Sequence, residues 1–133
     1  MKYLLDTHAL IWALLDPTKL TTKVRSIIAD SKNQVCVSVV SFWEIALKTS
    51  IGKFSLKNVN VKLLPKYAEQ MGLTIVDLQA QEAISLTDLP IKNNHKDPFD
   101  RMIICQSIVY KMALISKDSM FEQYKENGLL LLW

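Results

Sequence analysis

The chain has 133 residues, which is enough for one compact domain and too few for two. Half of the residues are hydrophobic and 22% are charged, and this balance excludes an intrinsically disordered chain. The net charge of +3 is mildly basic and does not by itself indicate a nucleic-acid-binding protein. No apolar run reaches the roughly 18 to 20 residues of a membrane span and no signal peptide is recognisable, so we expect a cytoplasmic protein without a membrane partner.

The two cysteines each lie within a run of apolar residues. Cys36 is flanked by valines and Cys105 follows two isoleucines, and neither belongs to a CxxC or Cys/His pair with zinc spacing. We therefore expect two small buried thiols rather than a disulfide or a zinc site.

Short apolar segments alternate with helical patterns along the whole chain. The predicted strands are 2–5, 34–39, 73–76, 112–116 and 129–133. The predicted helices are 8–15, 21–31, 41–51, 59–71, 79–86 and 98–110, with one further helical turn over 119–125. This alternation predicts a single α/β domain over residues 1–133, in which helices flank a central parallel sheet of four to five short strands.

Acidic residues stand close to the ends of the predicted strands. Asp6 follows the first strand, Glu44 lies one helical turn after the second, and Asp118 comes two residues after the strand that ends at Ser116. Asp100 opens the long helix that precedes that strand. Because ligands of open α/β sheets bind beyond the carboxyl ends of the strands, we expect these four carboxylates to converge at one edge of the sheet.

Four converging carboxylates repel one another unless a cation lies among them. A hard divalent cation removes the repulsion, and Mg²⁺, with Mn²⁺ as a substitute, prefers such all-oxygen ligands together with retained water. Carboxylate-held Mg²⁺ is suited to phosphodiester hydrolysis, with either one ion or a pair. The pattern therefore predicts a metal-dependent hydrolase.

Each acid also has an ordinary structural explanation. Ser41 and Glu44 have the spacing of a capping box, and Asp97 and Asp100 have the spacing of the N-cap and third residue of a helix. Asp6, like Asp118, is also of a type common in turns between strands and helices.

Basic side chains near these motifs are candidates for contact with a substrate phosphate. Lys48 follows Glu44 by four residues, so it either faces the acids or forms an ordinary ion pair on the surface of a helix. Arg101 either binds a phosphate or forms an inward structural salt bridge, and Lys96 is a candidate for backbone contacts of low specificity. For His8 and His95 we favour structural or substrate-positioning roles, because metal-activated water needs neither as an acid or base.

Four sequence motifs together resemble the PIN-domain nucleases. They are LLDTH at 4–8, SFWEI at 41–45, HKDPFDRMII at 95–104 and ISKDSMF at 115–121, and they occur in the family's order. Within the family, the chain most resembles the VapC-type toxins of bacterial toxin–antitoxin pairs. The resemblance extends from Tyr3 to Trp133 and implies a metal-dependent endoribonuclease with a PIN fold.

The resemblance also implies roles for individual residues and partners. It places Asp6, Glu44, Asp100 and Asp118 at the catalytic and metal-binding positions, with Thr7, Ser116 and Asp97 in possible supporting positions, Thr7 beside a metal-bound water. Asp97 is an additional acid that is an N-cap, an outer group or an alternative ligand. The implied partners are an RNA substrate, a cognate small antitoxin protein and a second copy of the chain in a homodimer.

Other protein classes with acids at strand ends fit the sequence less well. A receiver domain needs an acidic pair after its first strand, and a haloacid-dehalogenase-like phosphatase needs Asp-x-Asp there, whereas Asp6 is followed by Thr7 and His8. A PIN domain kept only as a binding module predicts lost acids, and all four are present. A PIN-fold nuclease that processes RNA without an antitoxin remains the alternative function.

Overall fold

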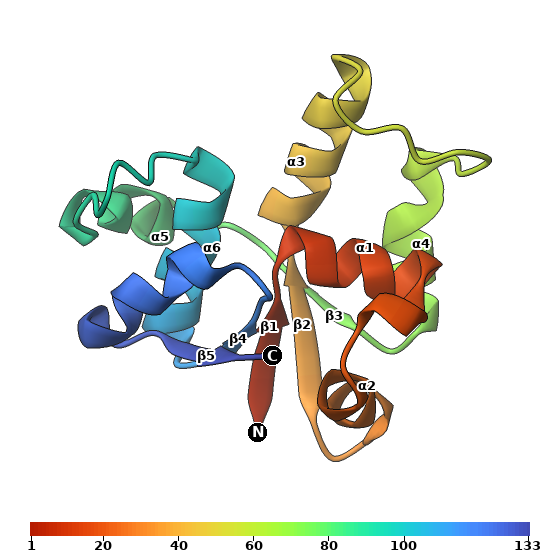
Figure 1. Ribbon diagram of the computed structural model, residues 1–133, viewed down its shortest axis with the longest axis horizontal. Coiled ribbons are helices and arrows are strands. Elements are labelled where there is room, and N and C mark those ends of the chain that lie inside the picture. Colours follow the sequence, from red (N-terminus) through yellow and green to blue (C-terminus); the bar gives the residue numbers. More distant parts are fainter.

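Five parallel strands form one sheet in the computed structural model, which describes residues 1–133 (Figure 1). The strands are β1 (Lys2–Leu5), β2 (Gln34–Ser38), β3 (Thr74–Val76), β4 (Ala113–Ile115) and β5 (Leu130–Leu132). Their order across the sheet is β3-β2-β1-β4-β5, so the first strand is central. The predicted parallel α/β architecture is confirmed.

Helices connect the strands and cover both faces of the sheet (Figure 1). The α-helices are α1 (Thr7–Leu15), α2 (Thr22–Ala29), α3 (Val39–Ser50), α4 (Leu64–Gln70), α5 (Ala80–Ser85) and α6 (Pro98–Tyr110). The 3₁₀ segments are Pro17–Lys19, Val61–Leu63, Leu86–Asp88 and Ser119–Asn127. No helix is both long enough and apolar enough to cross a membrane.

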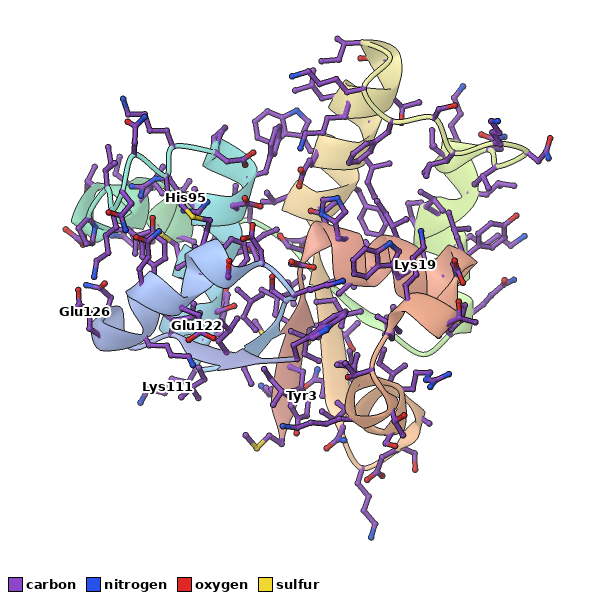
Figure 2. All side chains as sticks on the ribbon, in the orientation of Figure 1. Tyr3, Lys19, His95, Lys111, Glu122 and Glu126 are labelled. Carbon is purple, nitrogen blue, oxygen red and sulfur yellow. The ribbon has the colours of Figure 1, made fainter.

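Alternating side chains of the strands fill two separate hydrophobic cores. Leu5 and Val37 point into a core shared with α1, α2 and α4, whereas Leu4, Cys36 and Leu114 point into a core shared with α6 and the Ser119–Asn127 segment. Burial on both faces explains why these strands read as continuous apolar runs. Figure 2 shows side chains filling the space on both sides of the sheet, with charged residues such as Lys111 and Glu122 at the periphery.

The register of the central strands places their carboxyl ends level with one another. Leu5, the last residue of β1, lies opposite Val37 in β2 and Ile115 in β4. The residues that follow each strand, beginning with Asp6 and Ser116, therefore start from one edge. Helix α3 stands above this edge in Figure 1.

Two helix starts differ from the predicted ones by more than one residue. Helix α3 begins at Val39, and Ser38 is its N-cap because the Ser38 hydroxyl accepts a hydrogen bond from the Val40 N–H at 3.0 Å. Ser41 is therefore inside the helix, and the predicted capping box with Glu44 is wrong. The helix predicted over 59–71 is α-helical only from Leu64, after a 3₁₀ turn, where Pro65 fits the first turn without needing an N–H partner.

Both cysteines are buried and free, as the sequence predicts. Burial raises the pKa of each thiol, so both remain protonated near neutral pH. They act as small apolar side chains of the core.

Candidate active site

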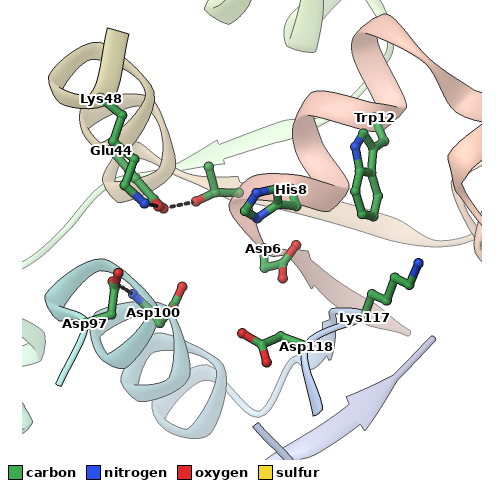
Figure 3. Close-up of a pocket in the computed structure, with 10 residues that line it drawn as sticks. Asp6, His8, Trp12, Glu44, Lys48, Asp97, Asp100, Lys117 and Asp118 are labelled. Atoms are coloured by element: carbon green, nitrogen blue, oxygen red, sulfur yellow. Dashed lines mark hydrogen bonds and ion pairs between the residues drawn. The ribbon is translucent and has the colours of Figure 1, made fainter. Parts of the chain in front are cut away.

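A pocket of about 490 Å³ opens at the carboxyl edge of the sheet. The four predicted acids meet there and are joined by one more carboxylate, so the acidic lining residues are Asp6, Glu44, Asp97, Asp100 and Asp118 (Figure 3). They come from the end of β1, from α3, from the start of α6 and from the segment after β4. The expected convergence of distant carboxylates is therefore present in the fold.

Three of these aspartates also cap helices. The Ala9 N–H donates to Asp6 at 2.8 Å, the Asp100 N–H to Asp97 at 2.9 Å, and the Met120 N–H to Asp118 at 2.9 Å. The N-cap role predicted for Asp97 is confirmed, and Asp6 and Asp118, which the sequence suggested as turn residues, are N-caps as well. They bring three helix N-termini to the pocket, and the partial positive charge at these termini favours carboxylates there.

Glu44 is held inside the pocket by two side chains. It is only 2% exposed, and one of its oxygens accepts a hydrogen bond from the Thr7 hydroxyl while the other is paired with the Lys48 ammonium. The Thr7 oxygen also lies 3.1 Å from the Ser41 hydroxyl, so α1 and α3 are joined by polar contacts beside the pocket.

Burial, together with the neighbouring acids, raises the pKa of Asp100 and Asp6. Burial is the largest cause at Asp100, where the charges of Asp97, Glu44, Asp6 and Asp118 add to it and raise the pKa to about 8. Burial likewise raises the pKa of Asp6, although the Ser116 hydroxyl and the Ala9 N–H oppose the shift. No lysine or arginine forms an ion pair with either aspartate.

The donor set fits a hard divalent cation. All the clustered ligands are carboxylate oxygens, and a cation would remove the repulsion that raises the pKa of Asp100. No three acidic, histidine or cysteine side chains are already arranged so that they could hold a metal ion together. Waters would therefore complete the coordination, as Mg²⁺ prefers, or the exposed Asp118 would move inward.

The predicted supporting residues lie beside the acids. Ser116 accepts a hydrogen bond from the Asp118 N–H at 3.0 Å, which fixes the turn between β4 and Asp118. Asp97 lines the pocket and caps α6, so its predicted role as an N-cap is confirmed. Its roles as an outer group or an alternative ligand stay predictions. Thr7 is buried and bonded to Glu44.

Lys48 lines the pocket, which favours the prediction that it faces the acids over an ordinary ion pair on the helix surface. Its ammonium pairs with Glu44 and lies over the rings of Phe54 and Phe99, at 5.3 and 5.9 Å from their centroids. Burial lowers the pKa of Lys48, but the Glu44 carboxylate, with Asp97 and Asp100, outweighs it, and the net shift is upward. Lys48 is therefore charged at neutral pH.

Arg101 does not line the pocket, and its predicted contact with substrate is wrong. Its buried guanidinium donates to the main-chain carbonyls of Leu89 at 2.9 Å and Pro90 at 3.1 Å. The alternative of an inward salt bridge is also wrong, because carbonyl oxygens rather than a carboxylate are its partners. Lys96 is exposed and lies outside the pocket lining, so its contact with substrate remains a prediction.

The buried side chains of His95 and Tyr124 form a chain of polar contacts that ends at Asp100. His95 Nδ1 lies 2.9 Å from the Tyr124 hydroxyl, and His95 Nε2 lies 3.4 Å from an Asp100 oxygen. The structural role favoured for His95 agrees with this position. Sequence reasoning missed Tyr124 because its spacing from the acidic motifs carries no signal.

Lys117, Trp12 and His8 complete the pocket lining (Figure 3). The Lys117 ammonium lies 5.9 Å from the ring centroid of Trp12 and pairs with no carboxylate. Lys117 was not predicted as a site residue, and the signal that would have found it is its position directly before Asp118.

A parallel α/β domain with a carboxylate-lined pocket beyond its central strands defines the class of this protein. The PIN domain family matches residues 3–127. The chain therefore belongs to the PIN domain family, as the four motifs predict. No curated protein matches the chain.

Solved structures share this fold at low sequence identity. VapBC2 from Rickettsia felis, bound to a DNA fragment from its promoter, superposes with a TM-score of 0.66 at 19% identity, over 99% of this chain and 98% of that one. VapBC-1 from nontypeable Haemophilus influenzae gives 0.60 at 18% identity, over 99% and 97%. A domain of a functionally unknown protein from Methanocaldococcus jannaschii gives 0.61 at 17% identity, over 99% and 89%.

Proposed function

We propose that this protein is a metal-dependent endoribonuclease and the toxin of a type II toxin–antitoxin pair of the VapC kind. One observation carries the proposal: four acids from separate segments of a PIN domain line a single pocket at the carboxyl edge of the sheet. The PIN fold is a nuclease fold, and an RNA phosphodiester is the substrate that we assign to it. We place this activity in the cytoplasm.

Asp6, Asp100 and Asp118 are the residues that would hold Mg²⁺ or Mn²⁺, and Glu44 lines the same pocket beside them. When bound, the cation supplies a nucleophilic water at neutral pH and positive charge for the scissile phosphate. Backbone N–H groups at helix starts already orient Asp6 and Asp118 at the pocket.

The remaining lining residues would bind and orient RNA. Lys48 and Lys117 place two ammonium groups in the pocket, and both would contact phosphate oxygens of the backbone. Trp12 offers a partly exposed aromatic face at the rim, on which an unpaired base would stack. Contacts of these kinds do not read sequence directly, which agrees with recognition of RNA by shape.

A cognate antitoxin and a second copy of the chain are the proposed protein partners. Two of the similar solved structures are of VapBC2 and VapBC-1, which supports a partner of this kind. Trp43 and Leu47 on helix α3 and its C-cap residue Ile51 follow one another at spacings of four residues, with 60, 40 and 57% of their surfaces exposed. An apolar stripe of this kind is typical of a helix that a protein partner covers.

Induction of the chain in a bacterial host, with transcriptome-wide mapping of RNA ends, tests the proposal. We expect growth arrest and new cleavage ends with the wild type, and neither with Asp118→Asn. Co-expression of the small protein encoded beside the gene should restore growth. Cleavage that the neighbouring protein does not suppress would favour the alternative function, a nuclease that processes RNA without an antitoxin. An absence of new RNA ends would overturn the proposal.

A further inference from the structure

Lys48 is an internal cation at one end of the acidic pocket. It follows Glu44 by one helical turn on α3, and its ammonium contacts a Glu44 oxygen (Figure 3). Only 22% of its side chain is exposed, and the rings of Phe54 and Phe99 lie beside the ammonium. This enclosure distinguishes the pair from a solvated surface ion pair, whose partners change freely.

The pairing lowers what Glu44 would gain from binding a metal, because Lys48 already neutralises its charge. Thr7 occupies one of its oxygens and Lys48 the other. By contrast, Asp6, Asp97 and Asp118 each accept a hydrogen bond from a backbone N–H through one carboxylate oxygen, and none of them is paired with a lysine or arginine. Glu44 differs from these acids in already having a positive partner.

The other cationic side chain of the pocket does not neutralise an acid in this way. The Lys117 ammonium is near the ring of Trp12, its side chain is exposed, and it forms no ion pair. The pocket is therefore divided by charge into a neutralised end at Glu44 and an end at Asp6, Asp100 and Asp118 without a cation. A divalent ion gains most at the second end.

We propose that the Lys48 ammonium takes the place of a second metal ion, so that the pocket binds one divalent cation, at Asp6, Asp100 and Asp118. Glu44 then acts as a positioning residue that holds Lys48, rather than as a metal ligand. An ammonium has three donors, so Lys48 retains N–H groups for a substrate phosphate while it stays bonded to Glu44. This inference rests on the metal site of the proposed function.

Mn²⁺ titration of the metal-free protein, followed by calorimetry and by the electron paramagnetic resonance of free Mn²⁺, tests the inference. We expect one bound ion in the wild type and in Lys48→Arg, which keeps the charge. Lys48→Met should expose Glu44 to the metal and bind a second ion. Adding Glu44→Gln to Lys48→Met should remove that second ion, whereas Glu44→Gln alone should leave one.

Lys117→Met is the matched control, because it removes an ammonium from the same pocket without uncovering a carboxylate. It should leave the stoichiometry at one. Two bound ions in the wild type would overturn the inference. So would a Lys48→Met variant that binds only one ion, with an affinity that rises no more than it does in Lys117→Met. If Lys48→Met does not fold, loss of the wild-type ion in Glu44→Gln alone would overturn it, and retention would support it.

RNA cleavage separates this inference from the function on which it rests. A protein that binds one ion and cleaves no RNA would contradict the nuclease proposal and leave the role of Lys48 standing. A nuclease that binds two ions in the wild type would retain its function and contradict the role of Lys48.

Discussion

The Thr7 hydroxyl and the Glu44 carboxylate are hydrogen-bonded inside the protein although 37 positions separate them in the sequence. The bond joins the first residue of α1 to the middle of α3, and it holds Glu44 at the acidic pocket. Thr7 is therefore a positioning residue that acts through Glu44, and this role depends on the fold alone.

Replacing Thr7 by valine should destabilise the metal-free protein. The substitution keeps the shape of the side chain but leaves a buried carboxylate oxygen without its donor, at a cost of about 1.5–3 kcal/mol. Thr7→Ser keeps the hydroxyl and should lose much less. Urea denaturation measures both free energies of unfolding, and equal stability of the valine and serine variants would contradict the role of the bond.

Stability of the metal-free protein should fall as the pH rises toward 8. Asp100 has a pKa of about 8 in the folded state against an ordinary value of 3.8, so the folded state binds more protons than the unfolded state between these values. The folded state is therefore favoured at acidic pH, and this contribution is lost as pH rises through the folded pKa.

Thermal denaturation between pH 5 and pH 9, a range of about four units around that pKa, checks this expectation. The melting temperature of the wild type should fall across the range, and most of the fall should be absent in Asp100→Asn. Glu69→Gln removes an exposed carboxylate far from these contacts and should leave the wild-type slope. A slope unchanged by Asp100→Asn would show that the titration of Asp100 is not its cause.

Tyr124→Phe should loosen the support of Asp100. The change removes the hydroxyl that is bonded to His95 at 2.9 Å, and we expect a loss of about 1 kcal/mol in the free energy of unfolding. It should also change the ¹⁵N chemical shift of the His95 ring, which a general loss of packing would not do selectively. Tyr67→Phe, at a tyrosine that is 38% exposed, is the control and should change neither quantity.

Arg101→Met should affect stability rather than substrate affinity. The guanidinium satisfies the buried carbonyls of Leu89 and Pro90, and losing charged hydrogen bonds of this kind costs about 1.5–3 kcal/mol. Lys96→Met, at an exposed residue, should leave stability within about 0.5 kcal/mol of the wild type. RNA affinity that falls in Arg101→Met without a loss of stability would contradict this assignment.

Local patterns predicted the features that depend on near neighbours in sequence. The apolar runs of β1, β2 and β4 identified buried parallel strands, and the strand ends then placed Asp6 and Asp118 at one edge. Pro98 correctly marked the start of α6. The N–H of the first helical residue has no partner within the helix, so a proline there loses no hydrogen bond.

Features that depend on side-chain direction were not predictable in the same way. Arg101 and Lys48 were equal candidates for the pocket, and only packing decides that one binds main-chain carbonyls while the other faces the acids. The start of α3 was misplaced because two serines near it are both good caps, and tertiary structure selects Ser38. Tyr124 is adjacent to His95 only after folding.

Cleavage of a labelled, structured RNA by purified, partner-free protein tests most directly whether the acidic pocket is a metal-dependent nuclease site. Asp6→Asn is the appropriate variant, because asparagine still accepts the capping hydrogen bond of α1 while it removes the charge. We expect Mg²⁺-dependent cleavage by the wild type, its loss in EDTA, and a decrease of about 100-fold or more in Asp6→Asn. Equal cleavage by both proteins that EDTA does not inhibit would contradict the account.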